Sequence, residues 1–209
     1  SVSDNWTTVA QRMLSRDDLK QGLALVCGIG SGRLVEELAQ QAPNLVIVAI
    51  DSDPGKIRAL RVKMDAAGLS GSRVSTMQGN LLDCRFAPYQ AALITSEDMN
   101  VVGSANDPRV VKELYKCARP LGGEIWLPTS DAQHMTLANF VTLATDMPLC
   151  NIQRCAVSMN GFTQIRRLGL PDEKLTLKPP LGLIVFGTEA LTPSAASSTV
   201  RDDIDVYTW

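Results

Sequence analysis

The sequence lacks a strong charge of either sign and any long apolar run. Its 209 residues include 20 Lys and Arg against 22 Asp and Glu, giving a net charge of −2 and a pI near 5.4. Nucleic-acid-binding domains typically have a pI above about 9, so we expect no nucleic-acid partner. No apolar stretch approaches the roughly 20 residues that span a bilayer, and no membrane association is predicted. The first residues show no leader pattern, and no compartment is assigned.

Cysteine pairs at metal-binding or redox spacing are also missing. The chain has an odd number of cysteines, and none of them forms a Cys-x-x-Cys pair: Cys27, Cys84, Cys117, Cys150 and Cys155. A disulfide framework or a structural zinc site needs cysteines paired at characteristic spacings. We therefore expect neither, and we predict no metal ligands.

Short apolar runs alternate with amphipathic segments through the first two-thirds of the chain. The predicted strands are 23–27, 45–50, 73–77, 91–95 and 123–127, and the predicted helices are 4–21, 33–41, 55–67, 108–118 and 132–145. Continuous apolar runs suit strands that are buried on both faces of a parallel sheet. Strands that alternate with helices form right-handed βαβ units. The sequence therefore predicts an α/β fold with a doubly wound, mostly parallel sheet.

The segment after the fifth predicted strand has a different pattern. Asn160-Gly161 stands between two further apolar runs, 152–157 and 162–168. An Asn-Gly pair in this position predicts an antiparallel β-hairpin, because both central turn residues need a positive φ. Residues 181–186 predict one more strand.

A glycine-rich loop, Gly28-Ile29-Gly30-Ser31-Gly32, lies between the first predicted strand and a predicted helix. Glycine permits a positive φ and lets a ligand approach the backbone closely. The helix that follows directs its free N–H groups and its positive dipole end toward such a ligand. In doubly wound sheets, ligands bind at the carboxyl ends of the strands. The loop is therefore the first candidate binding site, although many glycine loops are only tight turns.

An acidic residue ends the second predicted strand. Asp51 follows Gly32 by 19 residues, and an acidic residue about 20 residues after a glycine loop accepts hydrogen bonds from ribose hydroxyls. The alternative role for an aspartate here is to cap the next helix, which Pro54 opens. We assign the capping of the next helix to Asp53 and the hydrogen bonds from the ribose hydroxyls to Asp51.

The glycine spacing separates two classes of adenosine cofactor. A dinucleotide fingerprint, GxGxxG, needs glycine at position 33, where this chain has Arg33; its pattern is GxGxG. By this loop, by Asp51 and by Arg119-Pro120-Leu121-Gly122-Gly123 before the fifth strand, the chain resembles class I S-adenosylmethionine-dependent methyltransferases. The resemblance extends from Leu19 to Leu168 and includes the hairpin that this family places after its fifth strand.

The resemblance implies S-adenosylmethionine as the cofactor. The glycine loop would lie under its methionine part, Asp51 would hold the ribose, and Gly79-Asn80-Leu81 would lie beside the adenine. The residues implied in cofactor binding are Gly28, Gly30, Ser31, Gly32, Asp51, Ser52, Gly79, Asn80, Leu81 and Ser96. The chain departs from the family at Asn80, where Asp is common, and at Val26, where an acidic residue is usual. Loss of that acidic group would weaken binding by about 1–3 kcal/mol.

In this family the acceptor meets the cofactor beside the segment after the fourth strand, here Ser96-Glu97-Asp98. Glu97 and Asp98 are therefore the candidate catalytic residues, either as a general base or to orient an amine. A solvated loop is the alternative for both. The single histidine, His134, is predicted on the surface of a helix. The methyl acceptor stays unidentified.

The C-terminal part of the sequence differs in composition from the rest. We expect a methyltransferase-like domain over residues 1–187 and a Ser/Thr-rich, then acidic, linker or tail over residues 188–209. Residues 202–209 faintly resemble the link between methyltransferase-like domains and bacterial quinoprotein-type β-propellers, which implies further domains of the same chain as partners. Before this part, Arg166-Arg167 is predicted on an edge strand that faces solvent.

Three functions are weighed on these residues. The leading one is a domain that binds S-adenosylmethionine and transfers its methyl group. A catalytically silent binding or interaction module of a larger protein is favoured by Val26 and by the linker-like tail, since fold alone does not establish catalysis. An NAD-dependent oxidoreductase is disfavoured by Arg33 and by the lack of a well-placed Tyr–Lys pair.

Overall fold

The computed structural model describes residues 4–84, 86–99, 107–144, 147, 150–157 and 160–168. The chain divides into two units, 1–171 and 172–209, and every described residue belongs to the first. The strand predicted over 181–186, the tail and its predicted boundary after residue 187 lie outside the described residues. They stay predictions.

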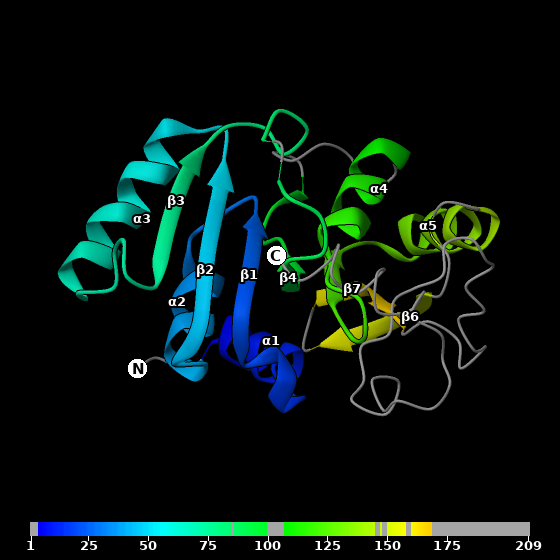
Figure 1. Cartoon of the computed structure of the whole chain (residues 1–209), viewed down its shortest axis with the longest axis horizontal. Coiled ribbons are helices and arrows are strands. Elements are labelled where there is room, and N and C mark those ends of the chain that lie inside the picture. The colour runs from blue at the N-terminus through cyan, green and yellow to red at the C-terminus, as the bar shows by residue number, and fades with distance from the viewer. Residues whose placement is uncertain are drawn as a thin grey trace, which may run out of the picture. The chain divides into compact units, whose positions relative to one another are not determined.

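A single seven-stranded sheet forms the centre of the described unit (Figure 1). Its strands are β1 (Gln21–Cys27), β2 (Asn44–Asp51), β3 (Val74–Gln78), β4 (Ala91–Thr95), β5 (Glu124–Pro128), β6 (Cys150–Val157) and β7 (Asn160–Arg167). The spatial order is β3-β2-β1-β4-β5-β7-β6. Strands β1 to β5 pair in parallel, whereas β7 runs antiparallel to both β5 and β6. The predicted fold class is confirmed.

Helices cover both faces of this sheet (Figure 1). They are α1 (Asn5–Met13), α2 (Arg33–Gln41), α3 (Pro54–Ala66), α4 (Pro108–Cys117) and α5 (Asp131–Leu143), with a short 3-10 helix at Asp17–Leu19. The side chains of α1, α2 and α3 share one apolar cluster, and those of α4 and α5 share another. Because successive strand residues point to opposite faces, Val26 joins the first cluster and Cys27 the second.

The first helix is shorter than predicted. Its capping box is present: the Asp4 carboxylate accepts from the backbone N–H groups of Trp6 and Thr7. Helical spacing from the buried Met13 would place the next inward residues at positions 16 and 17. Leu19, which is fully buried, does not fit that spacing, so the chain leaves the helix to bury it. The predicted helix over 4–21 is therefore wrong beyond residue 13.

The C-terminal hairpin is confirmed, but its turn is displaced. In β7, Asn160 pairs with Val157, and Gly161 pairs with Ala156. The Asn-Gly pair therefore lies inside the strand rather than in the turn. A Cβ at Gly161 would lie 1.9 Å from an amino group of Arg154, so the end of that flexible side chain would have to move to admit a larger residue.

The prediction that Arg166-Arg167 lies on an edge strand is wrong, although the Arg166 side chain is 43% exposed. Strand β7 lies between β5 and β6, so β6 is the edge. The guanidinium carbon of Arg167 lies 4.8 Å from the ring centroid of Tyr89 and 4.5 Å from that of Tyr115. Its Nη1 also donates to the carbonyl oxygens of Tyr115 and Ala118, both at 3.0 Å. Arg167 thus joins the end of the sheet to the end of α4.

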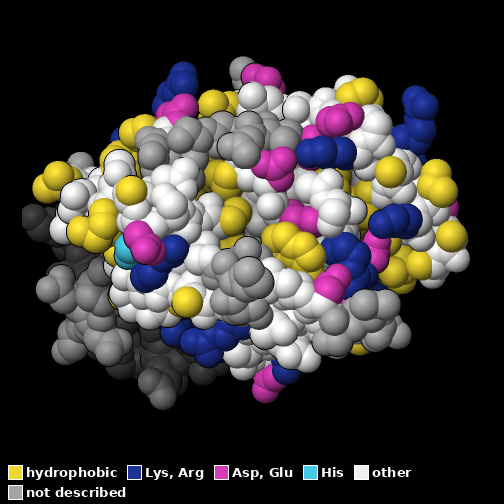
Figure 2. All heavy atoms as spheres, turned by 180° about the vertical axis from the view of Figure 1, so that it is seen from behind, with side chains coloured by type: hydrophobic (Ala, Val, Ile, Leu, Met, Phe, Trp, Pro, Cys, Tyr) yellow, Lys and Arg dark blue, Asp and Glu magenta, His cyan; other side chains and the backbone are white. Residues whose placement is uncertain are grey.

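The surface carries interspersed charges of both signs. Figure 2 shows Lys and Arg side chains among Asp and Glu over the face it presents, in agreement with the balanced composition. Among the described helices, none combines the length and the apolar character that a membrane span requires.

Replacing Arg167 by Lys should destabilise the fold. A lysine lacks the planar guanidinium that stacks between two rings and donates to two carbonyls, so we expect a loss of about 1–2 kcal/mol in the free energy of unfolding, measured by urea denaturation. Arg109→Lys, at a site where the side chain is 79% exposed, is the matched control and should change stability by less than about 0.5 kcal/mol. Equal losses in the two variants would contradict a structural role for Arg167.

Candidate functional site

The glycine loop connects β1 to α2, as predicted. Gly28, Gly30 and Gly32 have φ values of +89°, +59° and +83°, which L-residues with a side chain rarely adopt. Gly32 is the N-cap of α2 and offers no side chain to cap it. The first N–H groups of the helix therefore depend on other groups for hydrogen bonds.

The segment after β4 packs directly against this loop. A Cβ on Gly28 would lie 2.1 Å from the carbonyl oxygen of Asp98 and 2.9 Å from Ser96 Oγ. A Cβ on Gly30 would lie 2.7 Å from the Cγ of Glu97. Gly28 is therefore required to be glycine both by its backbone conformation and by the approach of the Asp98 backbone, whereas the close neighbour of Gly30 is the Glu97 side chain.

Glu97 binds the loop through its side chain. Its carboxylate accepts from the backbone N–H of Ser31 at 2.8 Å and of Leu34 at 3.2 Å, and also from the Ser31 hydroxyl. Its own N–H donates to the carbonyl oxygen of Gly28 at 3.0 Å. Glu97 is predicted from the sequence as a general base or as a group that orients an amine. Its contact with the loop is not predicted, because 63 residues separate Glu97 from Leu34 and no local pattern links them.

Two hydroxyl groups near the loop are buried without partners. Neither Thr95 Oγ1 nor Ser96 Oγ has a hydrogen-bond partner within the described ranges. Both residues are fully buried, and Ser96 is the one that approaches Gly28. Buried hydroxyls are normally paired, so Ser96 is a candidate partner for a polar ligand atom.

Asp51 lies at the end of β2, as predicted, and fixes the loop. Its fully buried side chain accepts from the N–H of Ile29 at 2.9 Å and of Asp53 at 2.9 Å. The Nζ of Lys56 lies 3.9 Å from the same carboxylate. A carboxylate has about four lone-pair sites, so these two N–H bonds leave capacity for another donor. The ribose contact stays a prediction.

The predicted cap of α3 is confirmed. Asp53 accepts from the N–H of Gly55 at 2.7 Å and of Lys56 at 3.4 Å, and Pro54 opens the helix. Ser52, between the two aspartates, is exposed. Asp51 therefore binds the glycine loop, and Asp53 caps α3.

The segment predicted beside the adenine lies next to Asp51. The N–H of Gly79 donates to the Asp51 carbonyl at 3.0 Å, and the side chain of Leu81 is buried. Asn80 Oδ1 accepts from the N–H of Leu82 at 3.1 Å, so this oxygen stabilises the turn. The amide nitrogen of Asn80 is the side-chain group left to meet a ligand.

Two further positions near the loop carry no chemistry of their own. Val26, where the family usually has an acid, is fully buried among apolar side chains. Burial raises the pKa of the Cys27 thiol far above its usual range, and the neighbouring Cys117 and Cys84 add to the effect. Cys27 therefore stays a neutral thiol, as expected for a core residue. No group of three potential metal ligands is found among the described residues.

Arg33, which stands where a dinucleotide fingerprint has its third glycine, faces α1 and its own helix. Its guanidinium contacts Asp4 at 2.9 Å, Glu36 at 2.5 Å and the buried Glu37 at 2.5 Å. The side-chain hydrogen bond from Arg33 lowers the pKa of Asp4. These contacts join α1 to α2 and keep the start of α2 in place.

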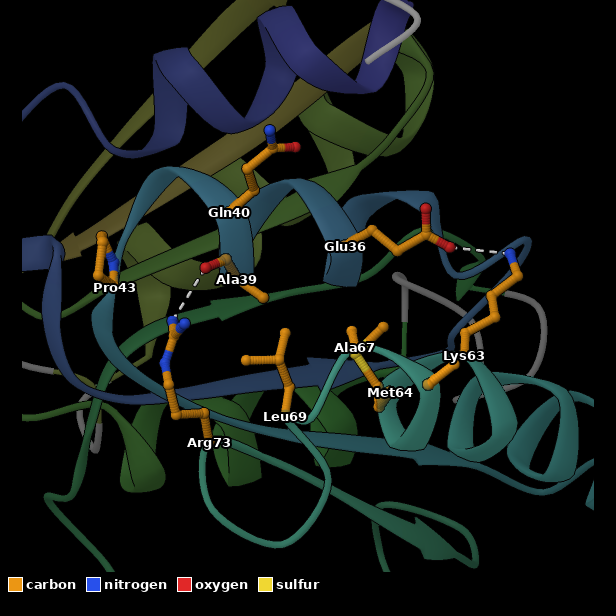
Figure 3. A pocket seen from close by; sticks show the side chains of 10 residues that line it. Glu36, Ala39, Gln40, Pro43, Lys63, Met64, Ala67, Leu69 and Arg73 are labelled. Atoms are coloured by element: carbon orange, nitrogen blue, oxygen red, sulfur yellow. Dashed lines mark hydrogen bonds and ion pairs between the residues drawn. The ribbon is translucent and has the colours of Figure 1, made fainter.

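Two other features lie apart from the glycine loop. A hollow of about 700 Å³ between α2 and α3 is lined by Pro43 and Arg73, which directly precede β2 and β3 (Figure 3). It therefore opens at the amino ends of these strands, and none of the predicted cofactor residues lines it.

His134 is half-buried, and its Nδ1 lies 3.0 Å from Thr163 Oγ1, so its prediction as a surface residue is only partly correct.

Comparisons with known proteins identify the fold. Residues 24–122 match a family model described as a methyltransferase domain. A Methanococcus maripaludis protein, whose structure is described as that of a candidate S-adenosylmethionine-dependent methyltransferase, is similar at a TM-score of 0.61 and 15% identity, over 79% of this chain and 86% of that one. A SAM-dependent methyltransferase of Aquifex aeolicus is similar at a TM-score of 0.59 and 14% identity, over 79% of this chain and 93% of that one. A methyltransferase of Podospora anserina with bound S-adenosylhomocysteine is similar at a TM-score of 0.56 and 19% identity, over 78% of this chain and 76% of that one. No curated protein sequence matches the chain.

The close packing of the glycine loop can be tested by adding one methyl group. Gly28→Ala combines a left-handed φ with a clash against the Asp98 backbone, and we expect it to lower the free energy of unfolding by at least about 3 kcal/mol. Gly68→Ala is the matched control, because Gly68 has a φ of +68° and nothing within 4 Å of an added Cβ. It should cost only about 1–2 kcal/mol. Urea denaturation measures both, and equal losses would show that the contact imposes no constraint.

Proposed function

We propose that this chain, which carries a class I S-adenosylmethionine-dependent methyltransferase-like domain, binds S-adenosylmethionine at the glycine loop and transfers its methyl group to an acceptor. The observation that carries the proposal is the loop itself. Three glycines in left-handed conformations lie at the carboxyl end of β1, and a buried carboxylate holds them beside the start of α2. The family match over residues 24–122 includes the loop, Asp51 and Gly79 to Leu81.

Each part of the cofactor would meet groups of matching chemistry. The backbone of Gly28, Gly30 and Gly32, with Ser31, would line the methionine part. The remaining lone pairs of Asp51 would accept from the ribose hydroxyls, with Ser52 beside them. Gly79, Asn80 and Leu81 would lie along the adenine, and the Ser96 hydroxyl would gain the partner that it lacks.

Methyl transfer places few demands on the protein beyond position. The cofactor supplies a methyl group on a sulfonium, and transfer leaves S-adenosylhomocysteine. The protein must hold the acceptor atom in line with that methyl group, and this orientation supplies most of the acceleration. An acceptor that carries a proton must also lose it. Asp98 is the proposed base; it is half-buried and lies 3.4 Å from Lys56 Nζ. Glu97, whose carboxylate binds the loop, is the weaker candidate.

A silent module is the second candidate function. It is supported by the apolar side chain of Val26, since no carboxylate stands there to order the amino end of the cofactor. In that case the domain would bind the cofactor weakly, or would serve only as an interaction unit for further domains of the same chain.

Calorimetric titration tests the proposal. We expect micromolar binding of S-adenosylmethionine and S-adenosylhomocysteine, and no binding of NAD. Asp51→Asn should weaken both cofactors at least about tenfold, because the ribose would lose a hydrogen bond to a charged group. Asp65→Asn, which makes the same change at an exposed position of α3, is the matched control, and circular dichroism checks the fold of both variants.

The other outcomes of this titration are informative. A folded chain that binds none of the three ligands would support the silent module. Binding of NAD alone would contradict the methyltransferase proposal. Unchanged affinity in Asp51→Asn would remove Asp51 from the ribose site while leaving the glycine loop in place.

A further inference from the structure

The N-terminus of α2 is occupied by a carboxylate from elsewhere in the chain. Leu34 is the second residue of the helix, so its N–H has no partner within the helix. That N–H and the N–H of Ser31 both donate to the carboxylate of Glu97. Negative charge is favoured at this end of a helix. Glu97 thus satisfies donors that would otherwise attract an anionic ligand group.

The backbone of Glu97 also forms a hydrogen bond with the glycine loop. The N–H of Glu97 donates to the Gly28 carbonyl at 3.0 Å. One residue therefore places an N–H group and a carboxylate on the glycine loop. The amino-acid end of S-adenosylmethionine carries the same two kinds of group, an ammonium and a carboxylate.

A second observation points to a ligand at this place. Ser96 Oγ is fully buried, lies close to Gly28 and has no hydrogen-bond partner among the residues described. A buried hydroxyl left unpaired costs free energy. The segment after β4 therefore places a hydroxyl that lacks a partner beside the loop, whose N–H groups Glu97 already occupies.

We propose that Glu97 is a built-in competitor for the carboxylate of the cofactor's amino-acid end. The inference rests on the proposed function, since it concerns the same loop. To bind, the cofactor displaces the Glu97 side chain from Ser31 and Leu34, and its own carboxylate takes over those two N–H groups. The half-buried Glu97 side chain turns toward solvent, while its backbone N–H keeps its bond to Gly28.

This exchange has a specific consequence for affinity. The two N–H groups are hydrogen-bonded to a carboxylate before and after binding, so the cofactor's carboxylate gains little from them. The nucleoside part is not involved in the competition. A ligand that lacks the amino-acid end, such as 5′-methylthioadenosine, should therefore be insensitive to Glu97.

The test is calorimetric titration of S-adenosylhomocysteine and 5′-methylthioadenosine into the wild-type chain, Glu97→Ala and Glu97→Gln. We expect Glu97→Ala to bind S-adenosylhomocysteine about tenfold more tightly, a change of about 1.4 kcal/mol, and to bind 5′-methylthioadenosine within about twofold of wild type. Glu97→Gln should be intermediate, because a neutral amide oxygen still accepts but holds the donors less strongly.

Controls separate this effect from damage to the fold. Glu113→Gln removes the same charge on α4, where Glu113 pairs with Lys116, and should leave both affinities unchanged. Thermal unfolding without ligand should show a lower Tm for Glu97→Ala, since α2 loses its N-terminal carboxylate. The same variant should show the larger rise in Tm when S-adenosylhomocysteine is added.

The result that overturns the inference differs from the one that overturns the proposed function. Weaker or equal binding of S-adenosylhomocysteine by a folded Glu97→Ala would show that Glu97 is no competitor. A parallel gain for 5′-methylthioadenosine would also overturn the inference, because the effect would not reside at the amino-acid end. Failure of every variant to bind either ligand would instead reject the proposed cofactor.

Discussion

The buried carboxylate of Asp51 is the interaction on which the candidate site depends. Its two oxygens bind the N–H of Ile29 in the glycine loop and the N–H of Asp53 at the start of α3. Its carbonyl accepts from Gly79, which follows β3. One residue therefore connects the segments after three neighbouring strands. Burial removes competition from water, which strengthens such contacts, and the shape of the site is set without a ligand.

The glycine loop also shows how a missing side chain positions a site. Without Cβ atoms at Gly28 and Gly30, the segment after β4 reaches the loop, and its polar groups come within bonding distance of the start of α2. The same closeness places the carboxylate of Glu97 on N–H groups at the start of α2. If the cofactor binds as proposed, it exchanges partners with this carboxylate.

The sequence predicts the sheet and helices well, because periodicity and glycine placement are local signals. The ends of elements were less predictable: the first helix stops where Leu19 must be buried, and Asn160-Gly161 belongs to a strand. The positions of Asp51 and Asp53 followed from spacing. The contact of Glu97 with the loop and the stacking of Arg167 did not, because they join residues more than 40 positions apart and depend on packing that no local pattern encodes.

The antiparallel end of the sheet has a consequence for biosynthesis. Strand β5 pairs with β4 on one side, and its other edge pairs with β7, which ends at Arg167. Trp126 in β5 packs edge-on against Phe162 of β7, with ring centroids 6.3 Å apart. A chain emerging from the ribosome has therefore made five parallel strands before β7 exists. Until β7 is made, the nascent domain presents an open strand edge and a tryptophan that lacks its aromatic partner, features that attract chaperones and promote misassociation.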